Sequence, residues 1–299
     1  MEILPANSRP TTSRAMTTNL VEEAKRLAGI RAVSEHFDPS ARYVGIGSGT
    51  TIIYVVEAIK EVIKQRNITN NIQFVPTGYQ SRQVIVDAGL TPIAFDSLPD
   101  GVMLEVAFDG ADEVDEELNC IKGGGACLFQ EKLVATRAKK FVCVADYRKN
   151  QSRLLTSWPS VPIEVAPMAA RTVITALRAL GSPAPKVRSG ILAKAGPLKT
   201  DQDFFIVDAP FKPLLTASDV RNGQDGSGKD GVWDIETLCQ KIKMISGVLE
   251  VGLFVGKNGY ETQAEGGQGG QKPVAAYFGM ADGSVEVRRA RPGTSLDIV

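Results

Sequence analysis

Short apolar runs alternate with amphipathic stretches through the first half of this 299-residue chain, and this alternation constrains its fold more than any other feature. Strands are predicted where the apolar runs are bounded by turn residues, at 43–46, 72–75, 91–95, 102–108 and 141–145. Apolar residues at helical spacing predict helices at 19–30, 50–65, 81–88 and 131–140. Strands that alternate with helices form βαβ units, so the first half is predicted to be an open α/β domain with a mostly parallel sheet.

The order of elements changes near Trp158, inside the segment LLTSWPSVP. The elements predicted after it are a strand at 161–165, a helix at 168–180, strands at 185–188 and 203–207, a helix at 234–245 and a strand at 248–254. This β-α-β-β-α-β order is that of a ferredoxin-like α+β domain. Two last strands, predicted at 274–278 and 284–287, flank an Asp-Gly hairpin signal, and we expect them to return to the first domain.

The length predicts about two domains. The predicted divisions are a larger domain at 20–158, a smaller one at 159–255 and the C-terminal return at 273–299. The first 19 residues have the Ser/Thr bias of a transit peptide, but their apolar residues show little helical periodicity, so a disordered tail is predicted for 1–19. Two polar, Gly-rich insertions are typical of flexible loops, at 221–231 and 263–272.

Charge and histidine content exclude several function classes. The 34 Lys and Arg residues balance 34 Asp and Glu residues, so the basic surface of a nucleic-acid-binding domain is missing. No run of about 18 apolar residues predicts a membrane span. His36 is the only histidine, which leaves multi-His metal sites without enough ligands. We expect His36 in a loop or at a helix end rather than in catalysis, so acid–base chemistry falls on carboxylates, lysines, tyrosines or cysteines.

The cysteine pattern indicates a reducing compartment. The four cysteines form no CxxC pair, and we expect free thiols rather than disulfides. They are Cys120, Cys127, Cys143 and Cys239. With no convincing targeting segment, a cytoplasmic protein is predicted.

A glycine-rich turn joins the first predicted strand to the helix after it, with the sequence Gly45-Ile46-Gly47-Ser48-Gly49-Thr50-Thr51. Glycines let the backbone approach an anion, to which helix N-terminal amides and hydroxyls donate. Thr50 stands where the dinucleotide fingerprint needs its third glycine, and no P-loop lysine follows. A small phosphate monoester therefore fits the turn better than a nucleotide does. The alternative is a plain glycine turn with a threonine cap.

Two further segments carry groups suited to catalysis. The strand predicted at 102–108 ends in an acidic burst whose Asp109 and Asp112 would lie at the ligand crevice of an α/β sheet. The alternative is a solvated acidic loop. Lys122 opens a run of three glycines, and Glu131 in the following helix can point back at the same site. A partly desolvated carboxylate there can move protons near neutral pH, although a surface Glu-Lys pair has the same sequence pattern.

Together, GIGSGTT, FDGADEVD and KGGGACLFQEKLVA closely resemble, in order and spacing, the A-type ribose-5-phosphate isomerase family. The likeness continues through FVCVADYRKN, VPIEV and GVLEVGLF and covers most of residues 20–299. The two Gly-rich insertions and the N-terminal tail resemble extensions of eukaryotic, especially fungal, members. The resemblance implies a Rossmann-like domain joined to a ferredoxin-like one. It also implies metal-independent interconversion of ribose 5-phosphate and ribulose 5-phosphate through an enediolate, without a cofactor, in the non-oxidative pentose phosphate pathway. A homodimer or a dimer of dimers is implied by the resemblance alone.

The family's functional residues can be carried over position by position. Glu131 matches the proton-abstracting glutamate, and the other residues expected in catalysis are Asp109, Asp112 and Lys122. The expected substrate-binding residues are Lys25, Ser48, Gly49, Thr50, Thr51, Asp109, Gly110, Ala111, Asp112, Lys122, Gly123, Gly124, Gly125 and Lys149. Ser-Gly-Thr-Thr replaces the Thr-Gly-Ser-Thr of many relatives with its hydroxyls retained. Cys127 replaces a usual alanine, which we expect to be tolerated packing.

Two other functions compete with an isomerase. One is a different enzyme of related fold, such as an amino-sugar-phosphate deaminase or a CoA-transferase-like protein. Deamination usually depends on a histidine, however, and His36 lies outside the motifs. The other is a non-enzymatic sugar-phosphate sensor, but residues 1–20 are too short for a DNA-binding head. A small sugar phosphate is thus the expected partner, with no nucleic acid or membrane.

Overall fold

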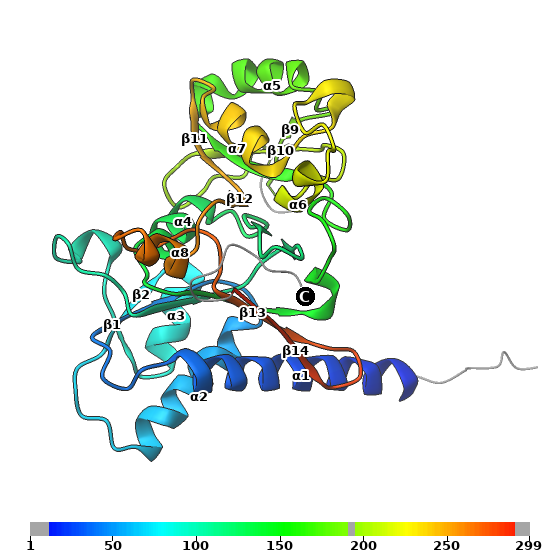
Figure 1. The fold of residues 1–299 in the computed structure, drawn as a ribbon. Coiled ribbons are helices and arrows are strands. Elements are labelled where there is room, and N and C mark those ends of the chain that lie inside the picture. Colours follow the sequence, from blue (N-terminus) through cyan, green and yellow to red (C-terminus); the bar gives the residue numbers. More distant parts are fainter. Residues whose placement is uncertain (1–11, 191–194, 291–299) are drawn as a thin grey trace, which may run out of the picture.

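A seven-stranded sheet organises the larger part of the molecule (Figure 1). The computed structural model describes residues 12–190 and 195–290. The strand order is β14-β13-β7-β4-β1-β2-β3, and every neighbouring pair is parallel except β13 with β14. The strands are β1 (Tyr43–Ile46), β2 (Gln73–Pro76), β3 (Thr91–Pro92), β4 (Val106–Asp109), β7 (Phe141–Asp146), β13 (Ala275–Gly279) and β14 (Val285–Arg289). Residues 291–299 of the predicted return lie outside the described residues.

Helices cover both faces of this sheet. They are α1 (Thr12–His36), α2 (Ile52–Gln65), α3 (Tyr79–Asp87) and α4 (Leu128–Thr136), with short 3₁₀ turns η1 (Phe95–Ser97) and η2 (Tyr147–Lys149). In Figure 1, α1 and α2 lie along the lower face of the sheet in blue. Their buried side chains, Ala28 and Val55 among them, join the sheet residues Val44 and Phe108 in one hydrophobic core. Helix α4 contacts both β4 and the second sheet, so it lies between the two.

The second sheet has four strands in the order β11-β8-β10-β9, all antiparallel to their neighbours. Its elements are β8 (Val161–Val165), η3 (Pro167–Ala169), α5 (Ala170–Ala179), β9 (Lys186–Val187), β10 (Phe205–Ala209), α6 (Ala217–Arg221), η4 (Lys229–Gly231), α7 (Ile235–Lys243) and β11 (Val248–Val251). The spacing of Val173 and Leu177 on α5, and of Leu238 and Ile242 on α7, gives each helix an apolar face that packs on this sheet.

A third, three-stranded sheet was absent from the sequence prediction. It contains β5 (Glu113–Val114), β6 (Cys120–Ile121) and β12 (Leu253–Phe254) in the order β12-β6-β5, and α8 (Gly259–Ala264) follows β12. Strands of two residues are too short to show alternation in a sequence. The small sheet matters for function because β6 leads directly into Lys122.

Several predicted boundaries were wrong. The helix predicted at 131–140 is α4, which begins at Leu128, directly after the glycines, and ends at Thr136. The strand predicted at 248–254 divides at Gly252, whose N–H donates to the Pro162 carbonyl and whose carbonyl accepts from the Lys122 N–H. The strand predicted at 102–108 is β4, which begins only at Val106 and ends at Asp109.

The disordered tail predicted for 1–19 was also wrong in part. Residues 12–19 belong to α1, because extending an existing helix by one residue costs far less than starting a new one. Residues 1–11 lie outside the described residues. The insertion at 221–231 is held by its backbone, since the Asp234 N–H donates to the Gly226 carbonyl and the Gly228 N–H to the Val232 carbonyl.

Replacing Gly252 with alanine should destabilise the fold. An added Cβ would collide with the backbone oxygens of Lys122, directly after β6, and of Pro162 on β8. We expect the free energy of unfolding to fall by about 1–3 kcal/mol, as in other overpacked sites. Urea denaturation measures the change, and Gly125→Ala is the matched control because its Cβ would meet no atom within 4 Å. Equal stability of the two variants would contradict the prediction.

Candidate active site

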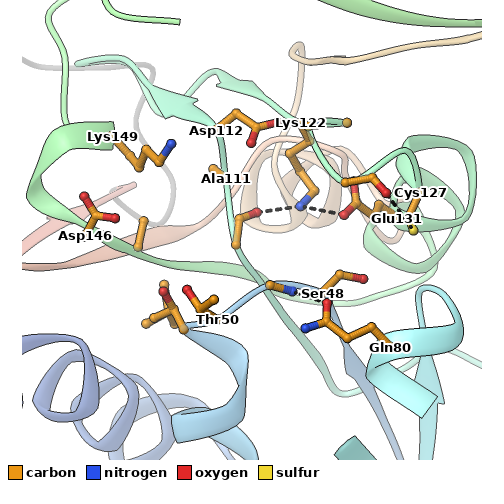
Figure 2. Close-up of a pocket in the computed structure, with 18 residues that line it drawn as sticks. Ser48, Thr50, Gln80, Ala111, Asp112, Lys122, Cys127, Glu131, Asp146 and Lys149 are labelled. Carbon is orange, nitrogen blue, oxygen red and sulfur yellow. Dashed lines mark hydrogen bonds and ion pairs between the residues drawn. The ribbon is translucent and has the colours of Figure 1, made fainter. Parts of the chain in front are cut away.

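A cavity of about 290 Å³ opens where β1, β4 and β7 end (Figure 2). Parallel α/β sheets bind their ligands outside the carboxyl ends of the strands, and this cavity has that position. Its walls come from the three segments singled out in the sequence, together with the end of β7 and the start of α3. The lining residues are Ser48, Gly49, Thr50, Thr51, Gln80, Gly110, Ala111, Asp112, Lys122, Gly123, Gly124, Gly125, Cys127, Glu131, Val144, Ala145, Asp146 and Lys149.

The loop from Ser48 to Thr51 forms the cavity wall between β1 and α2. Gly49 has a φ of 102°, a left-handed conformation that favours glycine. Its N–H donates to Oε1 of Gln80 at 2.9 Å, and the Ser48 and Thr77 hydroxyl oxygens are 3.1 Å apart. The loop directly precedes helix α2, so backbone amides, hydroxyls and a helix N-terminus lie close together. This arrangement suits a phosphate group.

Lys122 lies between two carboxylates at the bottom of the cavity. Its Nζ is 3.0 Å from Oδ2 of Asp109 and 3.5 Å from Oε1 of Glu131, and it donates to the Gly110 carbonyl at 2.5 Å. Each of these three side chains is at most 6% exposed. Burial alone would lower the pKa of Lys122, but the Asp109 and Glu131 carboxylates outweigh it and raise that pKa. Lys122 is therefore a permanent positive charge in the site.

Asp109 is buried behind the cavity wall rather than in it. Its Oδ1 accepts from the N–H groups of Ser48 at 3.0 Å and Gly110 at 2.7 Å, while Oδ2 pairs with Lys122. A Cβ on Gly47 would collide with the Asp109 side chain, so only glycine fits there. Both oxygens of Asp109 thus hold the first loop and Lys122 in place, and of the two aspartates in this segment Asp112 is the one that lines the cavity.

Asp112 is held by the glycine-rich loop. Its Oδ2 accepts from the Gly124 N–H at 2.6 Å, and a Cβ on Gly124 would lie 2.5 Å from Oδ1. Burial raises the pKa of Asp112, against the opposing effects of the Gly124 N–H and the Lys122 charge. The absence of a side chain at Gly124 therefore permits the short contact that fixes this carboxylate.

Glu131 has the properties of a proton acceptor. It lies in the first turn of α4, and Figure 2 shows it beside Lys122. Burial raises its pKa to about 8; Lys122 acts against that rise, and the neighbouring Asp109 and Asp112 add to it. Within residues 12–190 and 195–290, no group hydrogen-bonds to its buried Oε2. One carboxylate oxygen is thus paired with Lys122, and the other remains available to a ligand.

The two lysines carried over from the family lie in different places. Lys149, in η2, lines the cavity at the other end from Glu131 in the view of Figure 2, with its Nζ 4.9 Å from the centre of the Trp158 ring. Lys25 is buried on α1, where its Nζ donates to Glu22 at 2.8 Å, and it does not line the cavity. Apart from Lys25 and Asp109, the structure gathers every predicted site residue around one cavity.

Sequence reasoning missed several cavity residues. Asp146 ends β7, beside β4, and the rule that ligands bind at strand ends could have identified it. No sequence pattern indicated Gln80 as a site residue, because its partner Gly49 is distant in sequence. Cys127, expected to be packing, lies in the cavity wall and donates to the Gly125 carbonyl at 3.5 Å. Burial raises the pKa of the Cys127 thiol to about 12, so it stays protonated.

His36 and the other cysteines behave as the sequence predicted. His36 ends α1, with Nε2 2.8 Å from the Tyr277 hydroxyl oxygen, and burial lowers its pKa to about 4. All four cysteines are free. In the part of the chain that the structure describes, no cluster of three or more His, Cys, Asp or Glu side chains is placed to hold a metal ion. No helix in that part is long and apolar enough to cross a membrane.

Comparison with known proteins agrees with this geometry. The family described as Ribose 5-phosphate isomerase A (phosphoriboisomerase A) matches residues 73–265, more than half of the chain. The chain belongs to this family. The ribose-5-phosphate isomerase of Candida albicans is 42% identical over 91% of this chain and 98% of its own length. The Schizosaccharomyces pombe isomerase is 43% identical over 90% of this chain and 84% of its own.

Solved structures of ribose-5-phosphate isomerases share the mixed α/β fold and its large parallel sheet. The enzyme of Methanocaldococcus jannaschii superposes with a TM-score of 0.70 at 26% identity, covering 90% of this chain and 99% of that one. A D-ribose-5-phosphate isomerase in complex with phospho-erythronic acid gives a TM-score of 0.72 at 28% identity, with the same coverage. The resemblance to the ribose-5-phosphate isomerase family that the three motifs indicated is confirmed.

Glu131→Gln should become more stable relative to the wild type as the pH rises. The raised pKa means that the folded protein retains the Glu131 proton between about pH 4.5 and 8, where the unfolded chain has lost it. Stability contributed by that proton is therefore lost as pH increases through this window, at about 1.4 kcal/mol for each unit of pKa difference. Urea unfolding at several pH values measures it, with the exposed Glu116→Gln as control. A pH-independent difference between Glu131→Gln and the wild type would contradict the prediction.

Proposed function

We propose that this member of the ribose 5-phosphate isomerase A family interconverts D-ribose 5-phosphate and D-ribulose 5-phosphate. The observation that carries the proposal is the buried Glu131 carboxylate, with one oxygen beside Lys122 and the other without a hydrogen-bond partner among the residues that the structure describes. A single carboxylate can take a proton from C2 of the open-chain sugar and return it to C1. The transfer of the proton from C2 to C1 then needs no second base and no histidine.

The remaining residues divide between charge stabilisation and substrate binding. Removal of the C2 proton leaves an enediolate whose negative charge develops on the sugar oxygens. Lys122 and the amides of the 123–125 loop supply positive charge and N–H donors that stabilise it. Asp112, which faces the cavity with a raised pKa, moves the hydroxyl proton between O2 and O1. Asp109 supports this chemistry by fixing Lys122.

The phosphate end of the substrate binds at the other end of the cavity. The Ser48–Thr51 loop supplies amides and hydroxyls, and Lys149 supplies a positive charge. Oε1 of Gln80 accepts a hydrogen bond from the Gly49 N–H of this loop. Binding energy at the phosphate, remote from C1 and C2, positions those two carbons against Glu131. Phospho-erythronic acid, bound to a related isomerase, carries the same kind of phosphate group.

The finer description of the architecture belongs to the same proposal. We assign residues 20–158, with the return at 273–299, to a Rossmann-like domain and residues 159–255 to a ferredoxin-like domain. The β-α-β-β-α-β order and the antiparallel sheet β11-β8-β10-β9 support the second assignment. A cytoplasmic location fits the four free thiols. A homodimer or dimer of dimers, and a place in the pentose phosphate pathway, follow from the family resemblance.

Glu131→Gln should lower kcat by about 10²- to 10⁴-fold, the usual range for a lost general base. Ribulose 5-phosphate formation from ribose 5-phosphate is measured in excess EDTA for Glu131→Gln, for the wild type and for the control variant Glu116→Gln. Full activity of Glu131→Gln would show that another carboxylate is the base. Loss of wild-type turnover in EDTA would contradict the metal-free mechanism. A wild type that binds ribose 5-phosphate without converting it would favour a sensor.

The pH dependence of kcat/KM tests the state of Glu131 directly. A base must be ionised to accept a proton, and the pKa of Glu131 in the free enzyme is raised to about 8. We therefore expect kcat/KM to fall tenfold per pH unit below a value near 8, measured at constant ionic strength. A fall that begins only near pH 4.5, the value of an ordinary glutamate, would contradict the assignment of Glu131 as a buried base.

A further inference from the structure

The guanidinium of Arg188 joins the second sheet to the glycine-rich loop of the site. Arg188 directly follows β9 and binds Asp208 on β10 through Nε at 2.8 Å and Nη2 at 2.5 Å. Its Nη1 donates to the carbonyls of Gly123 at 2.8 Å and Gly124 at 3.0 Å. The Arg188 and Asp208 side chains are 18% and 16% exposed, so solvent competes little for these hydrogen bonds.

Holding these carbonyls also sets the direction of two N–H groups. A trans peptide is planar, and its carbonyl and N–H point to opposite sides. In the Gly123–Gly124 peptide, Arg188 holds the carbonyl, and the N–H donates to Asp112 at 2.6 Å. In the next peptide Arg188 holds the Gly124 carbonyl, so the Gly125 N–H points away from the guanidinium. Gly124 and Gly125, which carry these two N–H groups, line the cavity.

The loop has few means of fixing itself. Three consecutive glycines have no side chains to anchor them, and they lose more conformational entropy on folding than other residues do. Gly123 has a φ of 110°, and the space around the Cβ position of Gly125 is empty to 4 Å. One internal hydrogen bond, from the Ala126 N–H to the Gly123 carbonyl, spans the turn. A restraint from outside the loop is therefore needed to hold its amides in one orientation.

We propose that Arg188 is a positioning residue for catalysis: held by Asp208 on the second sheet, it fixes the peptides of Gly123 and Gly124, and through them Asp112 and the amides that face the substrate. This inference rests on the proposed isomerase function. Amides fixed in advance stabilise developing negative charge without reorganising during the reaction. The second sheet thereby contributes to a site whose lining residues all belong to segments outside it.

Arg188→Gln should lower kcat about 10- to 100-fold and leave KM within about threefold, because it loosens amides that act on the reacting atoms and leaves the phosphate loop intact. The loss is smaller than the roughly 10²- to 10³-fold cost of deleting an oxyanion donor, since the amides themselves remain. Arg188→Lys should recover little activity, because one ammonium cannot bind Asp208 by two bonds and reach both carbonyls.

Arg153→Gln is the matched control. Arg153 binds Asp219 with the same two-bond geometry, through Nε at 2.8 Å and Nη2 at 2.5 Å. Asp219 caps the short helix α6, and neither residue lines the cavity. We expect wild-type kcat and KM for Arg153→Gln. Circular dichroism and urea unfolding show for each variant whether the fold is retained.

Amide hydrogen exchange supplies a readout independent of turnover. Arg188→Gln should accelerate exchange in a peptide that spans residues 123–126, whereas Arg153→Gln should not. Asp208→Asn is the second variant should Arg188→Gln fail to fold, and it should shift exchange and kcat in the same direction to a smaller extent. Wild-type kcat together with unchanged exchange in the folded variants would overturn the role of Arg188, as would an equal loss of kcat in Arg153→Gln. Absence of turnover in the wild type would instead overturn the isomerase function, while the exchange data would still test the restraint on the loop.

Discussion

The ammonium of Lys122 is buried between Asp109, at the end of β4, and Glu131, at the start of α4, with the Gly110 carbonyl completing its partners. Burying the Lys122 ammonium together with two carboxyl groups costs solvation energy, which in protein interiors can exceed the attraction between the charges. Burial raises the pKa of Glu131 to about 8, with Asp109 and Asp112 adding to the rise and Lys122 opposing it, so the burial that encloses these charges also brings the Glu131 carboxyl into the pH range where it can exchange a proton near neutrality. The surrounding loops serve to maintain this arrangement.

Glycines make the arrangement sterically possible. The Asp109 side chain occupies the space that a Cβ on Gly47 would need, and Asp112 does the same at Gly124. Each carboxylate can then accept hydrogen bonds from backbone N–H groups at short distance. The sequence shows these glycines as two separate clusters. In the folded protein, glycine at both positions leaves room for an aspartate side chain to contact the main chain.

The second sheet is a support for the site as well as a separate layer. Arg188 holds the glycine-rich loop, and Glu164 on β8 accepts the N–H of Phe129 in the first turn of α4. Asp201 accepts the N–H of Tyr79 at the start of α3, the helix that carries Gln80. The glycine-rich loop, α3 and α4 are therefore each held by hydrogen bonds from residues between 159 and 255.

Sequence patterns by themselves predicted the element types of both main sheets and singled out the three site motifs, because these depend on local spacing and residue chemistry. The role of Glu131 as base was an expectation from the family resemblance. The start of α4 was missed, since the residues before Glu131 carry little helical periodicity. Contacts between distant segments, such as Arg188 with Gly123, or Gln80 with Gly49, leave no local pattern. Tertiary structure alone decided them, because burial and the meeting of separate strand ends set which groups lie within hydrogen-bonding distance and how far their pKa values shift.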